Sequence, residues 1–119
     1  MLEQDRQDAD RELVERIQQA PEGDLRAFEA LVERHKERVV ANCRYLSRSA
    51  TDAEDLAQEV FVKVFFGLAR FQGRAAFRTW LQRIKVNHVL NHIRKREGKR
   101  FVELERTLAR CGPADWLVD

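Results

Sequence analysis

Apolar side chains recur every three or four residues through most of the chain, which is the period of an α-helix. The pattern predicts a short helix over about 9–19, with Leu13 and Ile17 on its inner face. A second, longer helix is expected to begin after Asp24, a good N-cap residue, and to run to about Ser47. Strand-like alternation of apolar and polar residues is not sustained in any stretch of the sequence.

The third helix has the clearest pattern in the chain. Thr51 and Glu54 have the spacing of a capping box, which satisfies backbone donors at the start of a helix. The apolar residues that follow keep the helical period: Ala53, Leu56, Ala57, Val60, Phe61, Val64, Phe65 and Leu68. Acidic side chains in the first turns also favour the helix dipole, so their presence alone does not require a functional explanation.

The fourth helix, from Phe77 to about Arg96, changes character halfway along. One side begins with the apolar residues Phe77, Trp80, Leu81 and Ile84. The same side continues with Asn87, His88, Asn91, His92 and Lys95. The later apolar residues lie opposite: Val86, Val89, Leu90 and Ile93. We expect the first half to pack in the core and the second half to present polar groups to a partner.

Composition is consistent with one all-α domain, a compact bundle of about four helices. Of the 119 residues, 44% are apolar, which is enough for a core. We expect a disordered N-terminus over 1–8, the helical domain over 9–100, and the start of an interdomain linker over 101–119. The sequence has no membrane-length apolar run or signal peptide, and Cys43 and Cys111 lack metal or redox spacing. A reduced cytoplasmic protein is expected.

Charge is strongly segregated along the chain. Residues 1–69 carry a net charge of −5, residues 70–100 carry +9, and residues 101–119 carry −2. Nine net positive charges within one short segment predict a polyanionic partner there, and a partner of a different kind elsewhere.

Catalytic and metal-binding patterns are weak. The acidic residues of the third helix lie along an amphipathic helix and not in a cleft, and no nucleophile–base set or phosphate loop is present, so an enzyme is not expected. His88 and His92 have metal-like spacing but lack a third ligand close by, so neither a zinc site nor a cofactor is expected. His35, on an apolar stripe, is interpreted as a core or boundary histidine.

Three blocks of sequence together resemble a known family: GDLRAFEALVERH, DAEDLAQEVFVKVF and FRTWLQRIKVNHVLNHIRKR. In this order and spacing they are similar to conserved region 2 of bacterial sigma factors of the extracytoplasmic-function (ECF) group, within the sigma-70 superfamily. The similarity covers about 15–100. It implies an all-helical domain that binds RNA polymerase core and recognises and helps melt the promoter −10 element. Region 4, which reads the −35 element in full-length members, is missing from this sequence, so we expect a fragment or a truncated form, with a naturally short protein as the alternative.

The resemblance implies a protein-docking role for the third helix. In the family, this helix docks on the coiled coil of the polymerase β′ clamp. The matching positions are Asp52, Asp55, Gln58 and Glu59. Carboxylates can meet arginine side chains in bidentate geometry, which suits such an interface. Family members are commonly held inactive by an anti-sigma protein, so such a partner is expected too.

The resemblance also explains the polar half of the fourth helix, because melting requires capture of non-template single-stranded bases. Asn87, His88 and Asn91 are expected to face those bases, since amides suit base edges. The cations expected to neutralise phosphates are Arg83, Lys85, Arg94, Lys95 and Arg96. The preceding loop, which holds a flipped base in the family, matches Arg70, Phe71, Gln72, Gly73, Arg74 and Ala75.

Two questions remain open at the level of sequence. Aromatic residues near Trp80 act as a wedge in housekeeping sigma factors, but Leu81 stands here in place of a second aromatic, and a core role is favoured for Trp80.

A helical regulator of duplex DNA is the main alternative function, and it would prefer duplex to single-stranded DNA. A pure interaction module would show little salt-dependent nucleic-acid binding.

Overall fold

A computed structural model of the chain describes residues 3–96 and Arg106. The described helices are α1 (Glu3–Gln19), α2 (Arg26–Ser47), α3 (Ala50–Gly67), the short 3-10 helix η1 (Leu68–Arg70) and α4 (Phe77–Arg96). The expected linker over 101–119 lies outside the described residues, apart from Arg106. Over this described part, the expected all-α bundle of about four helices is confirmed.

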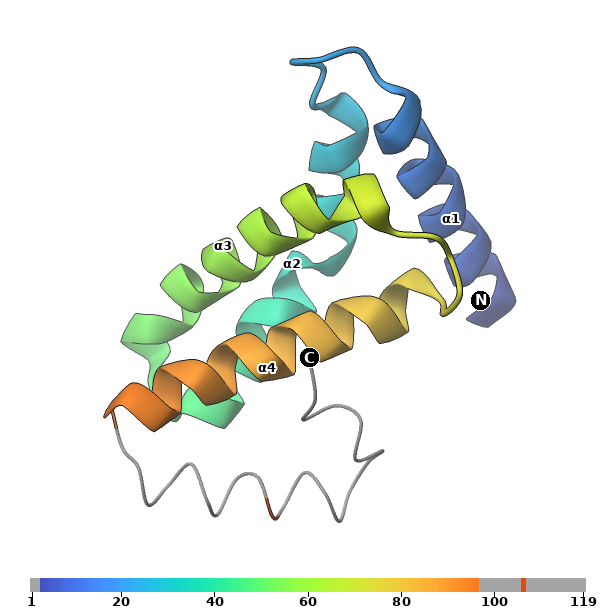
Figure 1. Cartoon of the computed structure of the whole chain (residues 1–119). Coiled ribbons are helices and arrows are strands. Elements are labelled where there is room, and N and C mark those ends of the chain that lie inside the picture. Colours follow the sequence, from blue (N-terminus) through green and yellow to red (C-terminus); the bar gives the residue numbers. More distant parts are fainter. Residues whose placement is uncertain (1–2, 97–105, 107–119) are drawn as a thin grey trace.

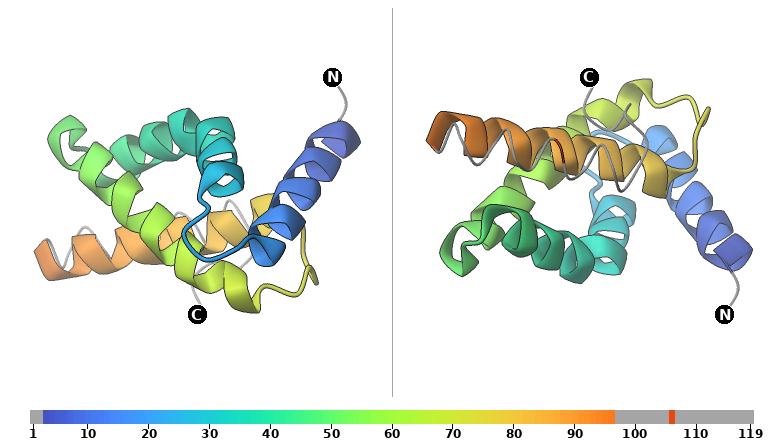
Figure 2. Two further views of the ribbon diagram at one scale, coloured as in Figure 1. Left: turned by 90° about the horizontal axis from the view of Figure 1, so that it is seen from above. Right: turned by 90° about the horizontal axis from the view of Figure 1, so that it is seen from below.

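The helices cross rather than lie parallel. α3 and α4 run in opposite directions, joined by a loop that passes beside α1, and α2 packs behind them (Figures 1 and 2). Within residues 3–96, none of the helices combines the length and apolarity needed to cross a lipid bilayer.

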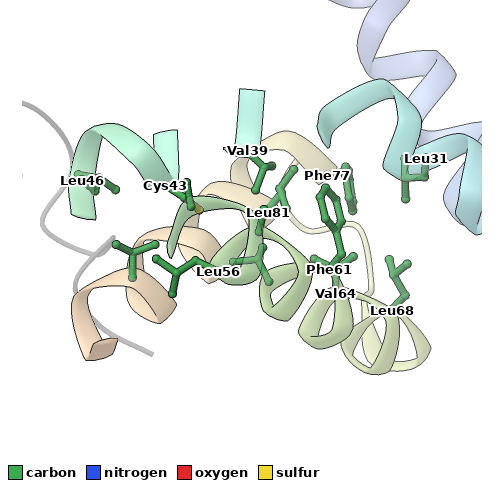
Figure 3. Close-up of a cluster of buried hydrophobic side chains, with 14 of the residues drawn as sticks. Leu31, Val39, Cys43, Leu46, Leu56, Phe61, Val64, Leu68, Phe77 and Leu81 are labelled. Atoms are coloured by element: carbon green, nitrogen blue, oxygen red, sulfur yellow. The ribbon is translucent and has the colours of Figure 1, made fainter. Parts of the chain in front are cut away.

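The buried face of α4 turns as the helix proceeds. Its buried residues include the i, i+4 row Phe77, Leu81, Lys85, Val89 and Ile93. Each step along such a row advances about 40° around the helix. The helix therefore crosses the core diagonally and buries one side at its start and the opposite side at its end. This crossing explains why the apolar stripe changes sides in the sequence, and Figure 3 shows its first half, where Phe77 and Leu81 lie against Val39 and Phe61.

The first helix begins earlier than expected, because α1 starts at Glu3 and not near residue 9. The structure thus differs from the expected disordered segment over residues 3–8. Asp10 explains the difference: it is 4% exposed, and Arg34 and His35 of α2 reach its carboxylate. Arg34 also donates to the backbone oxygen of Arg6, which ties the preceding turn of α1 to α2.

Two helix starts differ in detail from the sequence prediction. The N-cap residue of α2 is Leu25, and Asp24 instead accepts from the backbone N–H and guanidinium of Arg26. For α3 the predicted Thr51–Glu54 capping box is wrong. The cap is Ser49, whose hydroxyl oxygen accepts from the backbone N–H of Asp52 at 3.1 Å. The αL conformation of Arg48 ends α2 and places Ser49 as the first residue of the new turn.

Replacing Ser49 with alanine should lower the free energy of unfolding by about 1 kcal/mol, because the Asp52 N–H loses its acceptor. Urea denaturation followed by circular dichroism measures this difference. Ser49→Asp is the matched control, since an aspartate can accept the same hydrogen bond and should retain most of the stability. Equal stability of the alanine and aspartate variants would contradict the assignment of the cap.

Candidate nucleic-acid interface

The loop between η1 and α4 is held at its start by specific contacts. The side-chain amide of Gln18 in α1 donates to the backbone oxygens of Leu68 and Phe71, each at 2.9 Å. Gly73 has a φ of +72°, a conformation that side chains with a Cβ adopt only with strain. The loop is therefore shaped by its own glycine and fixed against α1. Gln18 was missed by sequence reasoning because its role depends on a contact distant in sequence.

A hollow of about 680 Å³ lies between this loop and α1. It is lined by Phe71, Gln72, Gly73, Arg74 and Ala75, the expected base-binding positions, together with Gln7, Arg11 and Gln18 of α1. Arg70, just before the loop, is exposed. The loop can therefore contribute to a concave site. Asn87, expected to face it, is not among the described residues that line the hollow.

Trp80 closes the inner side of the loop. Its ring centroid lies 4.8 Å from that of Phe71 and 5.9 Å from that of Phe77. It also packs over Gly67, where an added Cβ would come within 2.9 Å of the indole ring. Trp80 is half-buried against the core, which confirms the interpretation of a packing role. The close approach of its ring explains the small residue at the end of α3.

The exposed side of α4 is polar and positively charged. Arg83 and Asn87 are partly buried near its middle, while Asn91, Arg94 and Lys95 are exposed further along. Every charged residue from 70 to 96 is a lysine or arginine. Amide groups and cations thus occupy one continuous surface, the combination needed to hydrogen-bond bases and to attract a phosphate backbone.

Other polar residues of α4 face α3 rather than open solvent. His88 Nε2 lies 2.7 Å from Glu59 Oε1, and Arg96 pairs with Asp52. Arg96 also donates to the backbone oxygen of Ser47. These contacts between α4 and Asp52 and Glu59 of α3 form a polar seam. In the sequence analysis, the α4 residues are expected to contact DNA and the α3 residues to contact polymerase. Within residues 3–96, no group of three histidine, cysteine or acidic side chains is arranged to hold a metal ion.

Comparison with known proteins identifies the family. A family model described as sigma-70 region 2 matches residues 31–99, more than half of the chain. The chain belongs to the sigma-70 region 2 family. The resemblance to ECF sigma factors noted in the sequence is thereby confirmed.

Several curated relatives are sigma factors. The chain is 40% identical over 87 residues to RNA polymerase sigma-H factor of Pseudomonas aeruginosa, covering 73% of this chain and 44% of the relative. It is 44% identical over 85 residues to ECF RNA polymerase sigma-E factor of Haemophilus influenzae, covering 71% and 42%. It is 32% identical over 90 residues to ECF RNA polymerase sigma factor SigW of Bacillus subtilis, covering 76% and 48%. The chain spans less than half the length of each of these relatives.

A solved structure shares the fold. It is an engineered region 2 of sigmaE, determined by NMR in complex with GTAAAA. Its TM-score is 0.63 at 37% identity, and the match covers 74% of this chain and 93% of that one.

One residue of this sigma region 2 that was expected to contact DNA phosphates, Lys85, does not lie at the surface. Lys85 was assigned to the phosphate-binding surface, but it is 2% exposed and its ammonium donates to the side-chain oxygen of Asn42 in α2. Its expected surface position is wrong, because the turning buried face of α4 takes position 85 toward α2. The remaining expected cations, Arg83, Arg94, Lys95 and Arg96, are partly or fully exposed.

The acidic side of this sigma region 2 divides into two groups. Asp52 and Glu59 contact α4, although the Glu59 side chain is still 59% exposed. Asp55 and Gln58 are exposed and lie outside this polar seam. Gln58 borders an apolar groove of about 660 Å³ between α2 and α3. The groove includes the exposed side chains Leu25, Val62, Phe65 and Phe66.

Sequence reasoning missed this groove. The helical period placed Phe65 in the core, but its ring is 38% exposed and packs edge-on against Phe28, with centroids 5.0 Å apart. Val62 and Phe66, which lie off the apolar stripe, are 55% and 69% exposed. Large apolar side chains at such positions are a signal that could have indicated a protein-binding surface.

Proposed function

We propose that this chain is the part of a sigma factor that binds the single-stranded non-template −10 element during transcription initiation. The observation that carries the proposal is the likeness to sigmaE region 2, a protein whose structure was determined with GTAAAA bound. The uniformly cationic charge of residues 70–96 and the hollow beside the loop support the same function. A transcription role would place the chain in the cytoplasm, and at the nucleoid when polymerase is bound.

The proposed DNA contacts divide by chemistry. The hollow formed by Phe71–Ala75 and α1 accepts an extruded base, because it combines apolar and polar walls in a concave site. Asn87 and Asn91 offer amides to base edges. Arg94 and Lys95, both exposed near the end of α4, attract phosphates without regard to sequence.

RNA polymerase core is the second proposed partner, through the β′ clamp coiled coil. Asp55 and Gln58 are exposed polar residues of α3, and the apolar groove adjoins Gln58. This surface combines apolar area with acidic groups, which suits a partner helix that carries apolar and basic side chains. Promoter melting requires both partners to be bound together. An anti-sigma protein that covers either surface would inhibit the complex.

Strand preference tests the DNA-binding proposal. Fluorescence anisotropy with labelled oligonucleotides compares a single-stranded −10 sequence, its duplex, and variants changed at every base. Preference for the single strand, with base-dependent affinity, is the expected result. Preference for the duplex would favour the alternative of an ordinary duplex-binding regulator, and binding without salt dependence would favour an interaction module.

The double replacement of Arg94 and Lys95 by alanine should weaken every oligonucleotide about equally. The slope of log affinity against log salt concentration should also flatten by about 0.7 for each lost single-strand phosphate contact. Anisotropy titrations at several salt concentrations measure both effects. Lys36→Ala together with Arg44→Ala, two exposed cations on α2, is the matched control and should change the slope little. If only one oligonucleotide sequence lost affinity, Arg94 and Lys95 would be base readers and not phosphate contacts.

Charge reversal at Asp55 should weaken binding to a β′ clamp coiled-coil fragment, because the exposed carboxylate would lose its basic partner. We expect a loss of about 1 kcal/mol, typical of an exposed charge, without change in thermal stability. Glu37→Arg, an exposed acid on α2, provides the same change in charge elsewhere and serves as the control. Glu59→Arg is a poorer test, since it also removes the hydrogen bond with His88. Equal binding by the Asp55 and Glu37 variants would exclude Asp55 from the interface.

A further inference from the structure

The side chain of Gln18 joins α1 to the loop that leads into α4, where the loop passes beside α1 (Figure 1). Its amide nitrogen donates to two carbonyl oxygens, those of Leu68 and Phe71. Leu68 is 1% exposed, and its oxygen also accepts from the backbone N–H of Phe71 at 3.2 Å. Gln18 therefore connects the buried end of η1 to the first peptide unit that leaves it.

The backbone and the ring of Phe71 are held by different helices. The Phe71 carbonyl belongs to the peptide unit that links Phe71 to Gln72, and a peptide unit is planar, so a hydrogen bond at this oxygen orients the start of the loop. The ring is held from α4, with its centroid 4.8 Å from that of Trp80 and 6.4 Å from that of Phe77. The orientation of the Phe71–Gln72 peptide thus depends on α1.

The loop has no further hydrogen bonds until α4 begins. Among the described residues, no hydrogen bond or ion pair joins the segment 72–75 to the rest of the chain. The next fixed point is Ala76, whose oxygen accepts from the backbone N–H groups of Thr79 and Trp80 at 3.0 and 3.1 Å. The path of the segment is therefore set by its two ends and by the turn at Gly73, whose φ is +72°.

This segment forms one wall of the hollow of about 680 Å³, and α1 forms the other. The α1 wall is built from residues on one face of the helix: Gln7, Arg11, Val14, Glu15 and Gln18. The contacts of Asp10 with Arg34 and His35 hold α1 on α2. Because α1 has this separate attachment, loss of the Gln18 hydrogen bonds would release the loop wall and not the α1 wall.

We propose that Gln18 is a positioning residue for capture of the extruded base. By holding the Phe71–Gln72 peptide to α1, it keeps the two walls of the hollow at the separation that a bound base requires. Without these hydrogen bonds, binding would also have to order the loop, which lowers affinity. The inference rests on the proposed binding of the −10 strand. It extends that function to α1, which carries none of the DNA contacts expected from the sequence.

Oligonucleotides that lack one base test this role. GTAAAA, the oligonucleotide in the sigmaE region 2 complex, is titrated into the full chain together with versions that are abasic at each position in turn. Backbone amide NMR signals report binding. The base in the hollow is the one whose removal abolishes the shifts of the Gly73 and Ala75 signals and weakens binding.

Gln18→Met keeps a side chain of similar length but has no N–H donor. It should weaken binding of intact GTAAAA about tenfold, as expected from the loss of two ordinary hydrogen bonds, and change binding of the corresponding abasic version little. Gln19→Met, at an exposed position outside this hollow, is the matched control. Equal affinities of the two variants would overturn the proposal. A lower melting temperature with equal weakening of intact and abasic versions would also overturn it, because it would indicate a purely structural role.

Gln18→Lys tests whether the N–H donors are what matters. A lysine retains donors for the two carbonyl oxygens, so the preference for intact over abasic GTAAAA should persist. Its added charge should raise both affinities alike, and Gln19→Lys measures that contribution. A preference lost as fully as in Gln18→Met would contradict the role of the donors. If Gln18→Met does not fold, Gln18→Glu takes its place, since a carboxylate lacks donors, with Gln19→Glu as its control.

Failure of this inference differs from failure of the proposed function. An unmodified chain that binds no single-stranded oligonucleotide would contradict both, because no base would then enter the hollow. Base-dependent binding that Gln18→Met leaves unchanged would retain the proposed −10 function and overturn only the role of Gln18.

Discussion

Asp10→Asn is expected to lower the free energy of unfolding by about 2–3 kcal/mol at neutral pH, the range for breaking a buried charge pair with one partly exposed partner. The Asp10 side chain is 6% exposed, and Arg34 and His35 both reach the same carboxylate oxygen. An amide at this position would leave the partly exposed cation of Arg34 without its counter-charge. Because this pair joins α1 to α2, the loss should destabilise the whole bundle and not only the N-terminal turns.

The pH dependence provides a second test of the Asp10 contact. Burial by itself would raise the pKa of Asp10, but the hydrogen bonds and charges of His35 and Arg34 outweigh it and lower the pKa below the ordinary value of 3.8. The carboxylate therefore contributes stability above pH 3.8, and this contribution is lost as the pH falls through its folded pKa. The difference between the unmodified chain and Asp10→Asn should shrink correspondingly in acid.

Urea denaturation at neutral pH and at several acidic pH values measures both effects. Asp8→Asn is the matched control, since Asp8 lies on the same helix with a side chain 54% exposed, and its contacts with Gln4 at 3.0 Å and Arg11 at 3.8 Å are local to that helix. It should change stability by less than about 0.5 kcal/mol. Similar losses for Asp8→Asn and Asp10→Asn would show that the charge on α1, and not the buried contact, matters.

Asn87→Ala is expected to cost about 1–3 kcal/mol of binding free energy for the preferred base at one position of the −10 element, and little for other bases. Asn87 is partly buried, and it follows Val86 on a helix whose neighbouring turns are packed in the core. Hydrogen-bond readout needs a side chain held in position to this degree. The Asn87→Ala variant should therefore discriminate less between bases at that position of the −10 element.

The competing role for Asn87 is structural, as a hydrogen-bond partner that supports the fold. Its removal would then lower the melting temperature and weaken all sequences together. Anisotropy titrations with each base varied, combined with thermal denaturation of the same variant, separate the two roles. Asn91→Ala, one turn further along and more exposed, is the comparison and should have the smaller effect. Undiminished discrimination at every position would remove Asn87 as a reader.

Much of the fold follows from local sequence patterns. The four helices and the burial of residues such as Leu56, Val60 and Val89 follow from the helical period and from simple apolar content. What local patterns could not supply was the direction in which each helix crosses its neighbours. Lys85 illustrates this limit: a lysine is expected at the surface, and only the diagonal path of α4 takes it into contact with Asn42.

The candidate site was less accessible from sequence than the fold. The loop residues from Phe71 to Ala75 were identified through family resemblance, but the contribution of Gln18 depends on a contact that spans fifty residues. The cap at Ser49 was missed because Thr51 and Glu54 matched the usual spacing equally well, and the αL turn at Arg48 decided between them. The apolar groove was missed because periodicity alone assigns every phenylalanine on the stripe to the interior.

The diagonal path of α4 has a mechanical consequence. Phe77 and Leu81 join the core cluster from one side of the helix, whereas Val89 and Ile93 join it from a side that lies well around the helix from the first. A helix packed on a single side can rotate about its long axis, whereas a helix packed on two different sides resists rotation as well as sliding. The backbone at Asn87 and Asn91 is therefore kept at a constant angle to the rest of the domain. In the proposed DNA complex, the backbone at these positions needs no further ordering, so less entropy is lost when the contact forms.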